Sequence, residues 1–100
     1  MSALSEGKIE SEGFVFRLFV AGDELHSKTA RENLSRICER LDNRCEIEVV
    51  DVFTSFEKAL ENGVFLTPAL IKVLPRPRTT IFGNLSNIAE VLKALHSETQ

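Results

Sequence analysis

The spacing of apolar residues predicts two strands in the first half of the chain. Residues 14–21 are almost continuously apolar and rich in aromatic and β-branched side chains, which is typical of a central strand covered on both faces. Residues 45–52 alternate between apolar and acidic positions as far as Val49, and then place Val50 and Val52 on the other face. Both segments are therefore predicted to be strands.

Two other segments repeat their apolar residues at spacings of three and four, which predicts amphipathic helices. The first begins at Ser27, a residue type favoured as an N-cap, and runs to about Leu41. The second follows Asn87, which forms a capping pair with Glu90, and its apolar stripe ends at Leu95. Each helix is expected to bury one side.

The region between these helices predicts a shorter helix and a hairpin. Residues 54–57 match a capping box, in which a Thr hydroxyl and a Glu carboxylate bind opposite backbone amides. Asn62 and Gly63 then form a typical helix stop. Residues 70–74 and 79–82 are strand-like and are joined by a proline-rich turn, which indicates a hairpin.

The resulting order of elements, β-α-β-α-β-β-α, predicts a single α/β domain with a thioredoxin-like fold. In that fold Pro68, which follows Thr67 just before the third strand, occupies the position of a cis proline. We expect the domain to span residues 14–97. Residues 1–13 are polar and lack periodicity, which predicts a mobile tail.

Composition and charge narrow the class of protein. The chain has 100 residues, of which 43% are hydrophobic and 27% charged, values typical of a globular domain. Its net charge of −3 argues against a nucleic-acid partner, because phosphate binding needs a basic face. The longest nearly apolar run has eight residues, far fewer than the roughly 20 needed to cross a membrane. The first residues lack the apolar core of a signal peptide, so a cytoplasmic protein is expected.

The two cysteines are not placed for thiol chemistry. A thioredoxin-type oxidoreductase carries its cysteine pair between the first strand and the first helix, and here that loop, residues 22–27, contains none. Disulfide exchange needs a thiolate of lowered pKa at a helix N-terminus, whereas Cys38 is predicted in mid-helix and Cys45 at a strand start. The spacing of the two cysteines matches neither a redox motif nor a zinc site. We expect both thiols to be structural.

Other groups with chemical potential are few. His26 is predicted in a loop and His96 in the last helix, and their spacing does not suggest metal ligands. No catalytic residue, metal site or cofactor is therefore predicted. Lys72, Arg76 and Arg78 form a small basic cluster around the proline-rich turn, which either protects the sheet edge or binds an acidic partner.

Five short segments, taken together, resemble the KaiB circadian-clock family in order and spacing. They are Phe19-Val-Ala-Gly22, Val50-Asp-Val52, Thr67-Pro68, Lys72-Val-Leu-Pro75 and Gly83-Asn-Leu-Ser-Asn87. The resemblance covers residues 14–95. Its most specific part is the Lys-Val-Leu-Pro segment followed by Gly-x-Leu-Ser-Asn.

The resemblance implies a non-enzymatic protein that binds a KaiC-type ATPase. KaiC is a ring-shaped, RecA-like ATPase, and KaiB proteins bind its N-terminal ring and modulate its phosphorylation and ATPase output. In cyanobacteria the complex captures KaiA and displaces the sensor kinase SasA, whose N-terminal domain is also KaiB-like. KaiA and a SasA-like kinase are thus further expected partners, in circadian timing or stress signalling.

The resemblance also implies a metamorphic protein. The family's ground state has the order β-α-β-β-α-α-β and self-associates as a dimer or tetramer, whereas the KaiC-binding state is a thioredoxin-like monomer. Two packings of one sequence can coexist when they differ by only a few kcal/mol. Fold-switch or structural roles are carried over to Phe14, Pro68, Ala94 and His96. Phe14 replaces a common Tyr, and Ala94 and His96 replace a common Gly and Asp.

Carry-over from the family places partner binding at Glu48, Asn62 and Gly63. The basic cluster around the proline-rich turn adds Lys72 and Arg76 as candidate partner-binding residues. Clock-type members usually have basic residues at the positions of Glu48 and Gly63, and a proline at the position of Arg76. The sequence therefore resembles a divergent bacterial member of the family.

A second function class competes with this binding role. A thioredoxin-like protein could carry out unusual redox chemistry through Cys38 or Cys45. Insulin-reduction activity that is lost in Cys38→Ala or Cys45→Ala would indicate this class. The absence of a cysteine pair in residues 22–27 favours the binding protein.

Overall fold

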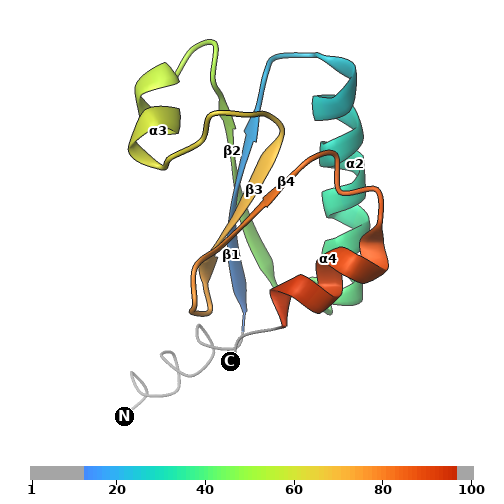
Figure 1. The fold of residues 1–100 in the computed structure, drawn as a ribbon. Helices are drawn as coiled ribbons and strands as arrows, with labels where there is room; N and C mark the ends of the chain where they lie inside the picture. Colours follow the sequence, from blue (N-terminus) through green and yellow to red (C-terminus); the bar gives the residue numbers. More distant parts are fainter. Residues whose placement is uncertain (1–12, 97–100) are drawn as a thin grey trace.

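The computed structural model of the protein describes residues 13–96, and its elements follow the predicted order (Figure 1). They are β1 (Phe14–Val20), α2 (Leu25–Arg40), β2 (Cys45–Asp51), α3 (Phe56–Glu61), β3 (Ala69–Leu74), β4 (Thr79–Phe82) and α4 (Ile88–Leu95). The order β-α-β-α-β-β-α is therefore confirmed. The predicted tail, apart from Gly13, lies outside the described residues, as does residue 97 at the predicted domain end.

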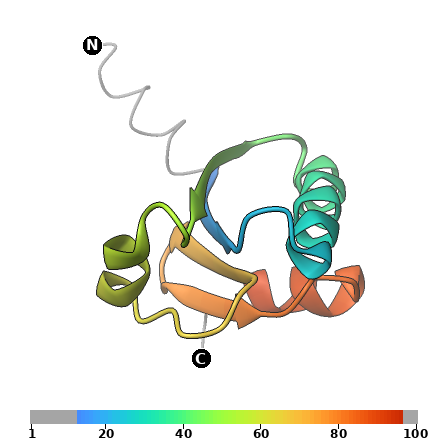
Figure 2. The same ribbon diagram turned by 90° about the horizontal axis from the view of Figure 1, so that it is seen from above.

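The four strands form one sheet in the order β2-β1-β3-β4. β1 pairs parallel with β2 and antiparallel with β3, and β3 and β4 form the predicted hairpin. The prediction of a central first strand is confirmed. Helices α2 and α4 lie on one face of the sheet, and the short α3 lies on the other, as the two views in Figures 1 and 2 show.

The core is divided between the two faces of the sheet. The larger part packs between the sheet and α2 and α4; its buried strand residues include Phe16, Leu18 and Leu70. The smaller part lies under α3 and contains Phe19 and Val50. Val50 is buried as predicted. Because six-residue α3 covers little area, much of its face of the sheet stays open.

Two of the three predicted caps are corrected by the structure. α2 begins two residues before Ser27, because the Glu24 carboxylate accepts the Ser27 backbone N–H and caps the helix from there. Ser27 is buried, and its hydroxyl accepts the backbone N–H of Ala21. His26 therefore lies in the first turn of α2 and not in a loop.

The predicted capping box of α3 does not form. The Thr54 hydroxyl donates to the Asp51 carbonyl instead, and Ser55, which occupies the N-cap position, makes no side-chain cap hydrogen bond. The Asn87 cap of α4 is confirmed, because its side chain accepts the Glu90 N–H at 3.2 Å. His96 is the C-cap of α4 and follows its last turn.

Two turn features agree with the sequence. The Thr67–Pro68 peptide bond is cis, as expected for this position in the fold. α3 ends at Glu61, and Gly63 adopts φ +71°, a conformation that side chains other than glycine rarely adopt. Within residues 13–96, no helix is long and apolar enough to span a membrane.

Candidate functional site

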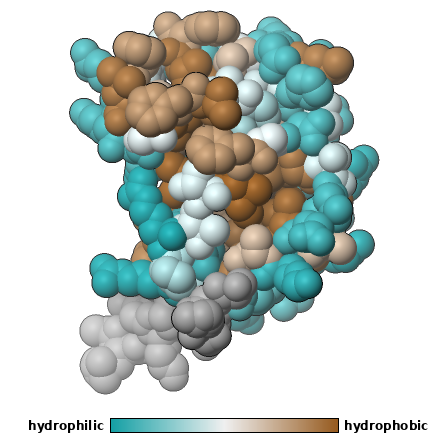
Figure 3. Space-filling model, viewed as in Figure 1, coloured by the Kyte–Doolittle hydropathy of each residue, from teal (hydrophilic) through white to brown (hydrophobic). Residues whose placement is uncertain are grey.

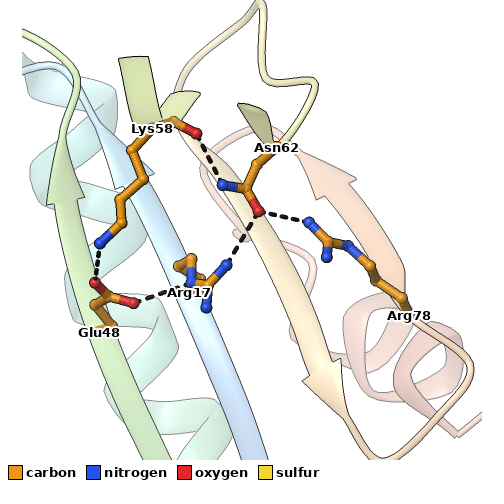
Figure 4. A network of polar contacts seen from close by, with 5 residues as sticks. All are labelled: Arg17, Glu48, Lys58, Asn62 and Arg78. Carbon is orange, nitrogen blue, oxygen red and sulfur yellow. Dashed lines mark hydrogen bonds and ion pairs between the residues drawn. The ribbon is translucent and has the colours of Figure 1, made fainter. Parts of the chain in front are cut away.

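A connected network of polar side chains lies on the α3 face of the sheet (Figure 4). Arg17 Nε donates to Glu48 Oε1 at 3.0 Å, and Lys58 Nζ donates to Glu48 Oε2 at 2.8 Å. The Asn62 amide oxygen accepts from Arg17 at 3.1 Å and from Arg78 at 2.6 Å. The network thus joins β1, β2, α3 and the residue directly before β4.

The register of the sheet explains why these residues meet. Arg17 and Glu48 are direct partners in the parallel β1–β2 pair, so their side chains project on the same face. Lys58 and Asn62 are four residues apart, which places them on one side of α3 and its C-cap. The Asn62 amide nitrogen also donates to the Lys58 carbonyl at 2.8 Å, which fixes the side chain at the helix end.

The network carries more positive than negative charge. It contains three cationic side chains and one carboxylate: Arg17 and Lys58 share Glu48, whereas Arg78 contacts the neutral Asn62 oxygen. The hydrogen bond from Lys58, and then that from Arg17, hold the pKa of Glu48 below its usual value. Glu48 is therefore ionised at neutral pH, and the network has a net surplus of positive charge.

The structure brings together some of the predicted partner-binding residues and separates others. Glu48 and Asn62 are linked through Arg17, and the exposed Gly63 follows Asn62 directly. Arg76 is exposed in the β3–β4 turn, and no contact links it to this network. Whether these residues bind a partner stays a prediction.

Lys72 does not belong to a basic surface cluster in this fold. Its side chain is only 1% exposed, and its Nζ donates to the Leu95 carbonyl at the end of α4 at 3.0 Å. It pairs with Phe16 in the sheet, which places it on the α2 and α4 face. The predicted cluster of Lys72 with Arg76 and Arg78 is therefore wrong, because alternation along β3 turns Lys72 inward. A partner cannot contact it in this fold.

Two of the four residues predicted to have a fold-switch or structural role contact each other. The rings of Phe14 and His96 meet edge to face with centroids 5.9 Å apart. His96 Nδ1 lies 2.9 Å from the Leu92 carbonyl oxygen, so the His96 ring is a hydrogen-bond partner of a carbonyl in the last turn of α4. Pro68 is buried before β3, and Ala94 is half-buried on α4.

An exposed apolar surface lies beside the network, over α3 and the residues on either side of it. Phe53 and Phe65 are 75% and 78% exposed, and Phe56, Leu60 and Leu66 are also largely exposed. Figure 3 shows apolar side chains gathered over α3. We call these five residues the α3 apolar patch.

The patch is hollowed between α3 and the residues that follow it. A hollow of about 250 Å³ is lined by Val52, Phe56, Ala59, Leu60, Val64, Phe65 and Thr67. Sequence reasoning missed this surface, since apolar residues at helical spacing usually indicate core. The signal that could have revealed it is the shortness of α3, which cannot bury so many large side chains.

The thiols are unsuited to redox chemistry. Cys38 is buried and Cys45 half-buried, and both are free. Burial raises the pKa of the Cys38 thiol to about 12, and the neighbouring Cys45 adds to this effect. Burial also raises the pKa of Cys45. Because the thiolate is the nucleophile in disulfide exchange, these shifts oppose that activity.

Among residues 13–96, no group of three or more His, Cys, Asp or Glu residues could hold a metal ion.

Comparison with known proteins gives two kinds of match. Residues 17–97 match the KaiB domain family. The circadian clock protein KaiB3 of Synechocystis sp. is 39% identical over 82 residues, which cover 81% of this chain and 80% of that protein.

Solved structures give the second kind of match. The N-terminal domain of SasA from Synechococcus elongatus has a TM-score of 0.71 at 18% identity, over 88% of each chain. The thioredoxin Deadhead of Drosophila melanogaster has a TM-score of 0.68 at 12% identity, over 94% of this chain and 90% of that one. These likenesses confirm the thioredoxin-like fold.

Proposed function

Because the chain belongs to the KaiB family, we propose that it is a non-enzymatic protein that binds a KaiC-type, RecA-like ATPase and modulates its phosphorylation and ATPase output. The observation that carries this proposal is the α3 face, where the polar network lies beside the α3 apolar patch. Exposed apolar surface with a polar border is the composition of a protein-binding surface.

Two further features support binding over catalysis. Residues 22–27, where a thioredoxin carries its reactive cysteines, contain none. The pKa of both thiols is raised, so neither is an activated nucleophile.

The proposal includes the wider setting of the family. The protein acts in the cytoplasm, in circadian timing or stress signalling, and its complex with the ATPase captures a KaiA and displaces a SasA-like sensor kinase. The likeness to the SasA N-terminal domain supports competition for one binding site, because both have the thioredoxin-like fold. A second state with the order β-α-β-β-α-α-β, which self-associates, is part of the proposal, and fold switching then regulates the amount of binding-competent monomer.

The direct experiment is a pull-down of the KaiC-type ATPase from the same organism, with ATP, with ADP and without nucleotide. We expect capture that depends on the nucleotide, because an ATPase presents different surfaces in its different nucleotide states. Absence of capture under all three conditions, by a chain shown to be folded, would contradict the proposal.

A charge substitution tests the proposed face. Glu48→Lys should tighten binding to a cyanobacterial-type KaiC by roughly threefold to tenfold, because clock-type relatives carry a basic residue there and opposite charges across an interface favour association. Glu32→Lys, the same change at an exposed residue of α2 on the other face of the sheet, is the matched control. Gly63→Lys is a less clean variant, because φ is +71° at Gly63. Equal affinities of unaltered chain, Glu48→Lys and control would exclude this face.

A further inference from the structure

One side of α3 is apolar and the other is polar, and both belong to the same exposed surface. Phe56 and Leu60 line the hollow on one side of the helix. Lys58 and Asn62 face the polar network on the other side. Ala59 is buried against the sheet, so α3 is held in place between the two regions. A partner that covers α3 therefore contacts an apolar hollow and a cationic network at once.

The network contains two guanidinium groups that are not fully neutralised, because Arg78 contacts no carboxylate in the network and Arg17 shares Glu48 with Lys58. Arg78 donates to the neutral Asn62 oxygen, and Arg17 donates to the same atom while it shares Glu48 with Lys58. Two cations that converge on one neutral oxygen leave a positive field at that point. Arg17 is part-exposed and Arg78 is exposed, so an anion from solvent can reach both. Guanidinium groups bind carboxylates with two parallel hydrogen bonds, which gives such a contact a defined geometry.

We propose that the α3 face docks a protein segment that combines a large apolar side chain with a nearby carboxylate. The apolar side chain enters the hollow beside Phe56 and Leu60, and the carboxylate binds Arg17 and Arg78. This proposal rests on the proposed function and names the kind of segment that the ATPase contributes. Asn62 positions the two guanidinium groups, and Glu48 limits their charge.

Two other occupants fit the observations less well. An anionic membrane would have to approach Glu57 and Glu61, which lie on the side of α3 opposite the buried Ala59, and a flat bilayer does not fill a hollow of about 250 Å³. A second copy of the chain that used the same face would bring two positive networks toward each other. A partner segment with a carboxylate meets neither obstacle.

The experiment measures the dissociation constant of the full chain and the KaiC-type ATPase at low and high salt. Phe56→Asn/Leu60→Asn should weaken binding about tenfold or more at both salt concentrations, because buried aromatic and aliphatic anchors dominate interface energies. Arg78→Gln should weaken binding by roughly threefold to tenfold at low salt and reduce the salt dependence. Glu48→Gln should strengthen binding, since it removes the carboxylate that competes for Arg17.

Matched controls lie on the other side of the sheet. Leu25→Asn removes an exposed apolar residue at the start of α2, and Arg40→Gln removes an exposed charge at its end. Both controls should bind like the unaltered chain. Circular dichroism of each variant shows whether the fold is retained, which the exposure of the substituted side chains favours.

The binding measurements test the docking site and the proposed function separately. If the unaltered chain binds and the α3 variants bind equally well, the docking site is wrong and the proposed function stands. If the unaltered chain does not bind, the proposed function fails and the occupant named here fails with it. Co-sedimentation with anionic vesicles, or a dimer that Phe56→Asn/Leu60→Asn dissociates, would also overturn the assignment of a protein segment of another chain.

Discussion

At the scale of single residues, burial decides the chemistry of the groups that the sequence singles out. Cys38 and Lys72 both lie inside the fold, where one is a thiol of raised pKa and the other an ammonium bound to the Leu95 carbonyl. Glu48 lies at the surface and is kept ionised by Lys58 and Arg17. A residue type therefore says little about function until its surroundings are known.

The raised pKa of Cys38 predicts a stability that falls at alkaline pH. The unfolded thiol ionises near its ordinary pKa of 9.0, whereas the folded thiol keeps its proton until about pH 12. The unfolded state thus releases the proton first, and the free energy of unfolding declines as the pH rises through this window. Urea titrations at several pH values between 8 and 11 should show the decline.

The control for this prediction is Cys38→Ser, measured over the same pH range. We expect a weaker decline in this variant, and Cys38→Ser/Cys45→Ser should keep its fold and its partner binding. Identical pH dependence in the unaltered chain and the variant would show that other groups cause the effect.

Contacts between residues far apart in the chain could not be predicted from the sequence. Arg17 lies inside a nearly continuous apolar run, and its partners Glu48 and Asn62 are 31 and 45 residues away, so no local pattern reveals the network. Lys72 is in a strand whose flanking residues are apolar, and a lysine there usually indicates the solvent side. Its register opposite Phe16 turns it inward, and the Leu95 carbonyl at the end of α4 supplies a partner for its Nζ there.

At the scale of elements, the strands and the two long helices were predictable because their apolar periods are strong. Their ends were less predictable, since caps depend on which side chain reaches which amide. Glu24 replaces Ser27 as the cap of α2, and Thr54 turns back to Asp51 instead of capping α3. The Asn87 cap formed as predicted, with its partner three residues away.

This contrast gives a paired prediction. Asn87→Ala should lower the free energy of unfolding by about 1 kcal/mol, the usual cost of losing an N-cap hydrogen bond. Thr54→Ala, at the position where the sequence alone predicts a cap, should cost clearly less, because its exposed hydroxyl contacts only the Asp51 carbonyl. Urea unfolding of both variants measures the difference, and a larger loss for Thr54→Ala would contradict the assigned caps.

At the scale of the whole molecule, the sequence predicted the fold because the order of elements and the family resemblance agree. It did not predict the open α3 face, because the area that a short helix covers depends on how it packs. The fold of this chain is thioredoxin-like, and the proposed second state requires residues near the C-terminus to leave α4. Ala94 favours the helix over a glycine by about 1 kcal/mol.

We therefore expect Ala94→Gly/His96→Asp to shift the population toward the proposed rearranged state. Alanine stabilises a helix interior, and an acidic residue at the negative end of α4 is unfavourable, so both changes weaken α4. NMR secondary shifts of residues 88–95, with sedimentation to measure the oligomer, should show a helical monomer in the unaltered chain and more strand-like shifts with a larger oligomer in the variant. Identical shifts in the two chains, or strand-like shifts and a tetramer in the unaltered chain, would contradict this.

We propose that this KaiB-family chain binds a KaiC-type ATPase through its α3 face. Hydrogen–deuterium exchange of the chain, alone and in complex with the ATPase and nucleotide, tests it most directly. We expect slower exchange on binding in residues 45–66 and around Arg17, with little change in α2 away from the interface. Protection confined to residues 25–40 and 88–95, or no protection at saturating ATPase, would contradict the claim.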